Sequence, residues 1–367
     1  MTTLPLEGLT VVAIEQAVAA PFATSRLADA GARVIKVERK EGDFARGYDS
    51  VANGLSSYFV WLNRGKDSVV LDLTTDQGRA ALSELLQSAD VLVQNLKPGA
   101  LARLGFAAER LVRDHPRLIV ASISGYGEHG PMAERKAYDL LVQADSGLSS
   151  ITGGPDGPAR VGISIVDIAT GATTYAAILE ALIRRGFTGK GANIQVSMFD
   201  VMADWLTVPL LNHEGGKSPE RLGLAHPSIA PYGVFACKDG AQVLISIQSD
   251  REWARFADVF IGRPELARDP RFATNVARVA NRPETDAAVA AAFAGRTLAE
   301  ATAAVLAADV ASATVNDMQG LSDHPHLRRI TVDTPNGPVS YPAPAPIFVD
   351  EPRQFGAVPA LGEKVKA

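Results

Sequence analysis

Asp167 lies where an extended segment meets a long apolar one, in the run VGISIVDIATG (161–171). Aspartate is among the best N-cap residues, so a structural role at the start of a helix explains it at least equally well. A carboxylate held beside backbone N–H groups is also suited to attack an activated carbonyl such as a thioester. Residue type and position are consistent with both roles.

Basic residues follow strand-like runs in the first half of the chain. Arg39 follows VIKVE, Lys97 and Arg103 follow DVLVQN, and Lys136 lies beyond a glycine-rich run. Ligands of open parallel sheets bind beyond the carboxyl ends of the strands, where collected cations could hold phosphates. Taken singly, each of these basic residues is explained equally well as an ordinary solvent-exposed surface residue.

The run GYGEHG (125–130) matches the GxGxxG dinucleotide fingerprint and follows a strand-like run. The fingerprint requires an apolar helix next, whereas the following residues are PMAER. We therefore predict a glycine-rich turn and no nicotinamide or flavin site.

Metal chemistry has little support in the sequence. Cys237 is the single cysteine, which excludes an internal disulfide and a multi-cysteine site. The six histidines are scattered, and the nearest pair, His324 and His326, flanks a proline. We expect no metal and no bound cofactor.

Strand and helix patterns alternate through the first half. The predicted strands are 9–15, 32–38, 68–73, 90–95, 117–124 and 193–198, with helices over 21–31, 76–89 and 167–187 and a second long apolar helix after 198. Such alternation predicts an α/β domain with a doubly wound, mostly parallel sheet.

The character changes after residue 211. Residues 212–228 are rich in glycine, proline and charge and indicate a linker; a KDG turn at 238–240 predicts a hairpin, and 251–260 and 283–308 are helical in pattern. We predict a large domain over 1–211 with residues 335–367 returning to it, a linker over 212–228, and a small α+β domain over 229–334.

Composition limits the functional classes. The 367 residues suffice for two domains, and 47% apolar with 21% charged residues describes a globular protein. A net charge of -5 disfavours nucleic-acid binding. No signal peptide or membrane-spanning run is apparent, so we expect a cytoplasmic protein that is not associated with membranes.

Seven motifs together resemble the class III CoA-transferase family, which includes formyl-CoA, carnitine and glutarate CoA-transferases. They occur in family order over nearly the whole chain. The motifs are PLEGLTVVAIEQAVAAPFATSRLADAGARVIKVER, NRGKDSVVLDL, DVLVQNLKPGALARLGF, LIVASISGYGEHGP, KAYDLLVQADSG, TGKGANIQVSMFD and DPRFATNVARVANR.

The resemblance implies a large doubly wound (Rossmann-like) domain, a smaller α+β domain, and a homodimer of interlocked rings. Asp167 falls on the family's nucleophile, which forms an aspartyl-acyl anhydride and then an aspartyl-CoA thioester. The implied substrates are an acyl-CoA, with succinyl-CoA or another dicarboxylyl-CoA favoured, and a small carboxylic acid. The implied CoA contacts are Val18, Ala19, Arg39, Leu71, Asn95, Leu96, Arg103, Lys136 and Tyr138.

Two other functions remain open at this point. The α-methylacyl-CoA racemase branch is similar in fold and CoA site, but uses a histidine where this chain has Tyr138, and a tyrosine of ordinary pKa is a poor base at neutral pH. A non-catalytic acyl-CoA binding protein would keep the cations without needing Asp167.

Overall fold

The computed structural model describes residues 4–349, 351 and 353–364. The chain forms two compact units. Unit 1 consists of Met1–Ser149, Arg160–Leu210 and Arg328–Ala367, and unit 2 of Ser150–Ala159 and Leu211–Leu327. The last segment of unit 1 thus begins seven residues before the predicted boundary at 335, because a strand starting at Arg329 pairs within it.

Unit 1 is built on a six-stranded parallel sheet of order β3-β2-β1-β4-β5-β6, which confirms the predicted α/β class. The strands are β1 (Thr10–Ile14), β2 (Arg33–Glu38), β3 (Lys66–Val70), β4 (Val91–Gln94), β5 (Ile119–Ser124) and β6 (Ala192–Ser197). The chain reverses its direction of winding between β1 and β4, the point where doubly wound sheets place their ligands.

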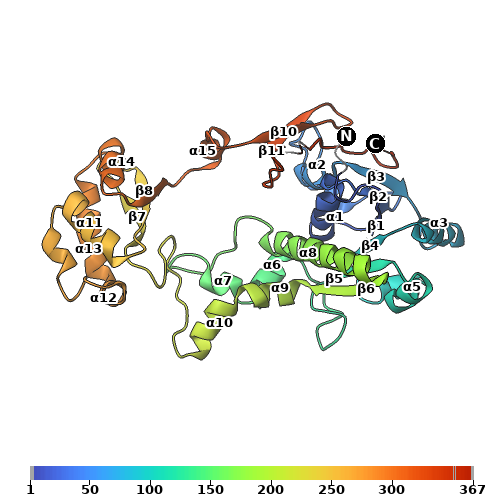
Figure 1. The fold of residues 1–367 in the computed structure, drawn as a ribbon, viewed down its shortest axis with the longest axis horizontal. Coiled ribbons are helices and arrows are strands. Elements are labelled where there is room, and N and C mark those ends of the chain that lie inside the picture. Colours follow the sequence, from blue (N-terminus) through green and yellow to red (C-terminus); the bar gives the residue numbers. More distant parts are fainter. Residues whose placement is uncertain (1–3, 350, 352, 365–367) are drawn as a thin grey trace. The chain divides into compact units, whose positions relative to one another are not determined.

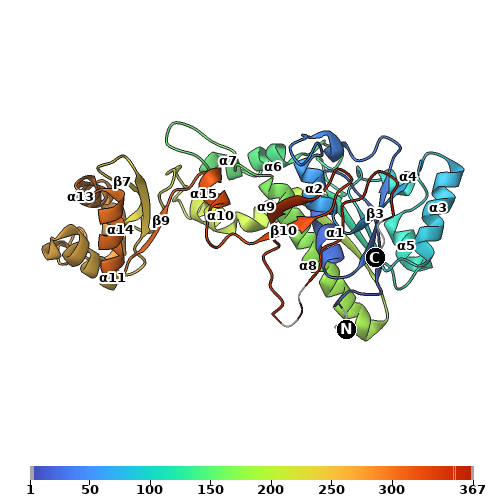
Figure 2. The same cartoon turned by 90° about the horizontal axis from the view of Figure 1, so that it is seen from above.

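Alternating apolar side chains bury both faces of this sheet, and Figure 2 shows helices on either side of it. Val11, Val93 and Ala121 pack under α1 (Ala19–Asp29) and α8 (Ile165–Thr188). Val12 and Leu92 face the opposite layer, which consists of α3 (Asp76–Gln87), α4 (Ala100–Arg103) and α5 (Ala108–Asp114).

Helix α8 is the longest helix of the described residues and crosses the sheet beside α1 (Figure 1). Gly171 permits this packing, since a Cβ there would lie 2.5 Å from the Ala19 carbonyl oxygen and 2.8 Å from Phe22 Cβ. By length and composition alone, α8 could cross a membrane. The core helices of globular proteins meet the same two criteria. In unit 1 it packs against α1, β5 and β6.

Two predicted elements differ in the structure. Strand β3 begins at Lys66 rather than 68, because Lys66 and Asp67 pair with β2 and their charges have partners in Glu15 and Arg33. The second long helix is divided into α9 (Met198–Trp205) and α10 (Thr207–Glu214), since Pro209 has no N–H to donate to the Trp205 carbonyl.

The remaining elements of unit 1 are α2 (Ser57–Asn63), α6 (Asp139–Asp145), β10 (Arg329–Val332) and β11 (Val339–Pro342), and α7 (Leu148–Ile151) spans the boundary at residue 149. The C-terminal tail follows the free edge of β3. The Gly65 N–H donates to the Ala357 carbonyl at 2.8 Å, and the Ser68 N–H donates to the Glu363 carbonyl at 2.7 Å.

Unit 2 contains an antiparallel sheet of order β7-β8-β9 packed on helices. The predicted hairpin is confirmed as β7 and β8 around the KDG turn. The elements are β7 (Tyr232–Ala236), β8 (Gln242–Ser246), α11 (Asp250–Phe256), α12 (Asn275–Ala280), α13 (Arg282–Ala294), α14 (Leu298–Ala307), β9 (Ala311–Thr314) and α15 (Met318–Ser322).

Candidate active site

A cavity of about 550 Å³ opens in unit 1 at the carboxyl ends of β1, β4 and β5. Most of the residues predicted from the sequence meet there, although they come from four separate segments. Those that line it are Val18, Ala19, Asn95, Leu96, Lys136, Tyr138 and Asp167. The predicted glycine-rich turn contributes Gly125, and no helix follows it directly.

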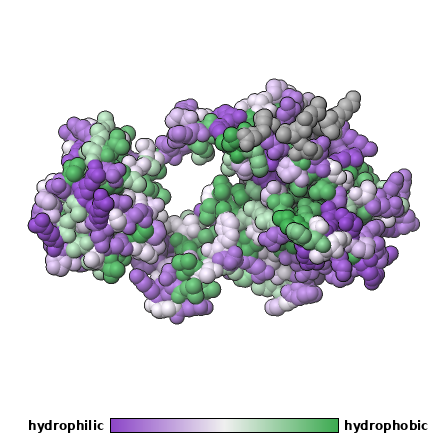
Figure 3. All heavy atoms as spheres, in the orientation of Figure 1, coloured by the Kyte–Doolittle hydropathy of each residue, from purple (hydrophilic) through white to green (hydrophobic). Residues whose placement is uncertain are grey.

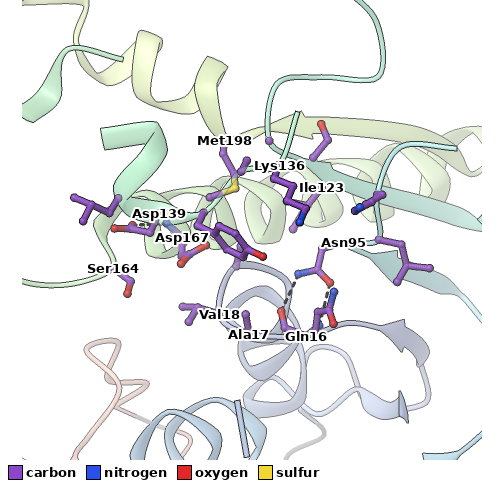
Figure 4. Close-up of a pocket in the computed structure, with 18 of the residues that line it drawn as sticks. Gln16, Ala17, Val18, Asn95, Ile123, Lys136, Asp139, Ser164, Asp167 and Met198 are labelled. Carbon is purple, nitrogen blue, oxygen red and sulfur yellow. Dashed lines mark hydrogen bonds between the residues drawn. The ribbon is translucent and has the colours of Figure 1, made fainter. Parts of the chain in front are cut away.

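The turn between β1 and α1 forms one wall of this cavity and is held from two sides. Asn95 accepts the Gln16 N–H at 3.0 Å and donates to the Gln16 carbonyl at 2.8 Å (Figure 4). On the other side, Asp43 Oδ1 accepts the Ala17 N–H at 3.1 Å. The side-chain amide of Asn95, predicted as a CoA contact, is therefore used to shape the turn.

Asp167 is the third residue of α8 and is not its N-cap, so the structural interpretation of this residue is wrong. Ser164 occupies the N-cap position without a side-chain hydrogen bond. The capping oxygen comes instead from Asp139 Oδ1, which accepts the N–H groups of Val166 at 2.7 Å and of Asp167 at 3.3 Å. Among the described residues, the Asp167 carboxylate has no hydrogen-bond or ion-pair partner.

Asp139 is itself fixed by polar contacts. Its Oδ2 accepts from Gln143 Nε2 at 2.6 Å, and Gln143 Oε1 accepts the Val161 N–H at 2.9 Å. These contacts tie the start of α8 to α6 and to the segment before the helix, so that Asp167 enters the cavity in a defined position (Figure 4). Sequence reasoning missed Asp139; its signal was an aspartate directly after Tyr138.

The surroundings of Asp167 favour its protonated form. Burial in the cavity wall and the nearby negative charge of Asp139 raise the pKa of Asp167 to about 7. A carboxylate that gains little from solvent is a stronger nucleophile than one in water. The side chain can therefore ionise near neutral pH and react.

Three aromatic side chains also line the cavity, namely Phe44, Tyr48 and Tyr58. Tyr48 packs edge-on against Tyr58 with ring centroids 5.5 Å apart, and Phe44 lies 5.7 Å from Tyr48. Burial, followed by the charges of Asp43 and Asp167, raises the pKa of Tyr48 to about 12. Its phenol stays protonated and can donate a hydrogen bond into the cavity.

A second cavity of about 480 Å³ adjoins the first and shares Gln16 and Leu96 with it. It contains two more of the predicted residues, Arg39 and Leu71. Arg103 borders neither cavity and is exposed on α4. The structure thus joins nine of the ten predicted residues in two connected hollows.

A buried ionic network borders the second cavity through Glu15 and Asp43, and sequence reasoning did not identify it. Lys66 contacts Glu15 Oε1 at 2.7 Å, and Lys36 contacts Glu15 Oε1 at 3.4 Å and Asp43 Oδ2 at 2.9 Å. All four side chains are fully buried or nearly so. Part of its signal in the sequence was the presence of Glu15 and Lys36, two charged residues, within apolar strand runs.

Metal ligands do not gather in the part of the chain that the structure describes. Those residues contain no group of three or more His, Cys, Asp or Glu side chains that could hold an ion.

Comparison with known proteins gives a consistent result. A model of CoA-transferase family III matches residues 6–365. The chain is 44% identical over 289 residues to the acetyl-CoA:oxalate CoA-transferase of Acetobacter aceti, covering 78% of this chain and 74% of the relative. It is 40% identical over 291 residues to the succinate–glutarate CoA-transferase of Agrobacterium fabrum, covering 76% and 72%.

A solved structure agrees over almost the full length. The CaiB/BaiF family protein from Brucella suis matches with a TM-score of 0.83 and 36% identity, covering 99% of this chain and 97% of that one. Since the family match, the relatives and the fold coincide, the chain belongs to CoA-transferase family III and is a CoA-transferase.

Proposed function

We propose that this enzyme moves coenzyme A from an acyl-CoA donor to a small carboxylic acid through covalent intermediates on Asp167. One observation carries the proposal: the Asp167 carboxylate faces a cavity at the carboxyl ends of the sheet without a hydrogen-bond partner among the described residues. A carboxylate held for structural reasons would be expected to accept hydrogen bonds.

The steps balance without a metal, an oxidant or net proton transfer. An Asp167 oxygen attacks the donor carbonyl, the C–S bond breaks, and CoA thiolate leaves an aspartyl-acyl anhydride. The thiolate attacks the aspartyl carbonyl and releases the donor acid, leaving an aspartyl-CoA thioester. The acceptor carboxylate displaces the thiolate to form a second anhydride, and the thiolate then attacks the acceptor carbonyl, which regenerates Asp167.

The two connected cavities are suited to a long ligand. The first holds Asp167 and the turn that contains Val18 and Ala19, and the second holds Arg39 beside Leu71. We infer that the acylated thiol end of CoA lies in the first cavity and that its nucleotide extends into the second. Lys136 and Arg39 supply positive charge along this path for phosphate groups.

Dicarboxylic acids are the substrate class that we favour, with succinyl-CoA or another dicarboxylyl-CoA as the donor. The names of the two relatives include oxalate, succinate and glutarate. In the first cavity, the Arg160 guanidinium donates to the Val161 carbonyl at 3.1 Å and forms no ion pair with a described residue, whereas Arg135 is paired with Asp145. Arg160 is thus available for the distal carboxylate.

We also propose that two chains form an interlocked homodimer. Large apolar side chains are exposed in unit 1, among them Ile183 at 64% and Phe187 at 88% on α8. Figure 3 shows apolar surface over parts of this unit. Exposed apolar surface of this kind is typical of a face that a protein partner covers.

Thioester exchange tests the proposed reaction directly. The protein is incubated with succinyl-CoA and a panel of mono- and dicarboxylic acids, and new thioesters are identified by mass spectrometry. We expect dicarboxylyl-CoA products, and borohydride reduction of the reacting enzyme should convert Asp167 to an alcohol. Absence of any new thioester, together with exchange of the α-proton of a 2-methylacyl-CoA in heavy water, would instead establish a racemase.

A further inference from the structure

The turn between β1 and α1 adopts a backbone conformation that its sequence does not favour. Ala17 has φ of +64°, a left-handed region that glycine adopts readily and alanine does not. The conformation matters because Gln16, Ala17, Val18 and Ala19 all line the first cavity. Surrounding contacts must therefore hold Ala17 in place.

Asp43 makes the contact that acts on Ala17 itself. Its Oδ1 accepts the Ala17 N–H at 3.1 Å and the Ala45 N–H at 2.9 Å, and its Oδ2 accepts from Lys36 Nζ at 2.9 Å. The two oxygens thus connect the turn on one side to a buried cation on the other. Asp43 is only 5% exposed, so solvent cannot easily replace either contact.

The same network reaches the first turn of α1. Lys66 Nζ donates to Glu15 Oε1 at 2.7 Å and to the Pro21 carbonyl at 3.1 Å, and Lys36 contacts both Glu15 and Asp43. Both ends of the segment from Ala17 to Pro21 are therefore fixed by one set of buried charges.

We propose that Asp43, supported by Lys36, is a positioning residue that holds the Gln16–Ala19 turn in its ligand-binding shape. This inference rests on the proposed function, since it assumes that the acyl-CoA occupies the cavity which the turn lines. Asp43 also lines the second cavity, but its two oxygens bind the N–H groups of Ala17 and Ala45 and the Lys36 ammonium, so the proposed role acts through the turn.

Asp43→Asn breaks the connection with little change in volume. A carboxylate accepts hydrogen bonds with both oxygens, whereas an amide has one acceptor and one donor group. Asn at this position would direct its NH2 group either at Lys36 or at the N–H groups of Ala17 and Ala45, and one contact must fail.

Asp29→Asn is the matched control. Asp29 is 8% exposed, ends the same helix α1, and pairs with the buried Arg64 through an Nε contact of 2.8 Å. A purely structural role for buried aspartates predicts similar losses for both variants. Our proposal predicts that CoA affinity, measured by isothermal titration calorimetry, falls at least tenfold in Asp43→Asn and less than twofold in Asp29→Asn.

Ala17→Gly supplies a rescue that a general loss of stability would not show. Glycine adopts positive φ without strain. The double variant Asp43→Asn/Ala17→Gly should therefore bind CoA at least threefold more tightly than Asp43→Asn. Equal affinity losses in Asp43→Asn and Asp29→Asn, or no recovery in the double variant, would overturn the proposal.

Two further measurements keep the outcomes separate. CoA affinity can be measured without the transfer reaction. If the wild-type protein shows no transfer activity, the proposed function is refuted. The CoA affinities of the variants still decide the role of Asp43. If Asp43→Asn does not fold, amide exchange in the wild-type protein decides. The Ala17 N–H should exchange as slowly as the amides of β1, and exchange at the rate of an exposed loop would refute the contact.

Discussion

Asp139 accepts the backbone N–H of Asp167 at 3.3 Å, so one carboxylate fixes the helix turn that carries the other. The same proximity places two negative charges together and adds to burial in raising the pKa of Asp167. Asp139 therefore has two effects, one on the position of the proposed nucleophile and one on the pH at which it ionises.

Replacing the proposed nucleophile should abolish transfer without preventing binding. We expect Asp167→Asn to lower kcat by at least about 1,000-fold, because the amide cannot form either covalent intermediate, while CoA affinity changes little. Steady-state kinetics and calorimetry measure the two effects. Asp114→Asn, at an exposed position on α5, is the control and should behave as wild type.

The same variant should be more stable than wild type. Because the folded-state pKa of Asp167 is raised to about 7, ionisation costs stability as pH rises from about 4 to 7. The neutral Asn avoids this cost, so Asp167→Asn should gain about 1 to 2 kcal/mol at pH 8 and much less near pH 4. Urea unfolding at the two pH values provides the test, and a loss of stability at pH 8 would contradict the assignment.

The pH profile of transfer should report the ionisation of Asp167. We expect kcat/KM for the acyl-CoA to fall about tenfold per pH unit below pH 7 and to level off above it, since the carboxylate is the reactive form. Asp139→Asn removes the neighbouring negative charge, so its midpoint should lie at lower pH. A midpoint that stays in place would show that burial alone sets the pKa.

Arg160 should distinguish dicarboxylic from monocarboxylic acceptors. If its guanidinium binds the distal carboxylate, Arg160→Met should raise KM for a dicarboxylate by about tenfold and leave KM for a monocarboxylate of similar length unchanged. Arg135→Met is the comparison, because Arg135 lies in the same cavity but is paired with Asp145 at 3.1 Å. Equal effects on both acids would assign Arg160 a general electrostatic role.

Interlocked rings have a kinetic signature that an ordinary dimer lacks. We expect a particle of twice the 38.7 kDa chain mass in sedimentation, which does not dissociate on dilution. Two differently tagged homodimers, mixed under native conditions, should form no mixed dimer, because exchange requires a chain to unfold. Mixed dimers after minutes would support a conventional interface.

Much of unit 1 could be predicted because its signals are local. Proline and glycine near the ends of α1 indicated helix limits that the structure confirms within about two residues, and the predicted limits of α3 agree equally well. The break between α9 and α10 was missed, although Pro209 was its signal. Apolar periodicity continues through a proline, so the pattern alone did not show the interruption.

The sequence predicted which residues lie in the candidate site better than it predicted the contacts that these residues make. Asp167 was placed by its motif, but Asp139 as the cap of α8 depends on a contact across 28 residues that no local pattern encodes. Asn95 is expected to contact CoA, and its contact with Gln16, a partner 79 residues away, was not foreseen. Contacts between distant segments depend on how the sheet is assembled, and local sequence patterns do not encode that assembly.

The C-terminal tail along β3 has a consequence for the synthesis of the protein. Residues 211–327, nearly all of unit 2, are inserted between parts of unit 1, so they leave the ribosome before the segment that completes the first unit. Until Ala357 and Glu363 accept the N–H groups of Gly65 and Ser68, the outer edge of β3 is unprotected. The nascent chain thus carries an aggregation-prone strand edge until residues 357–363 have been synthesised, and termination before residue 357 would leave that edge unpaired permanently.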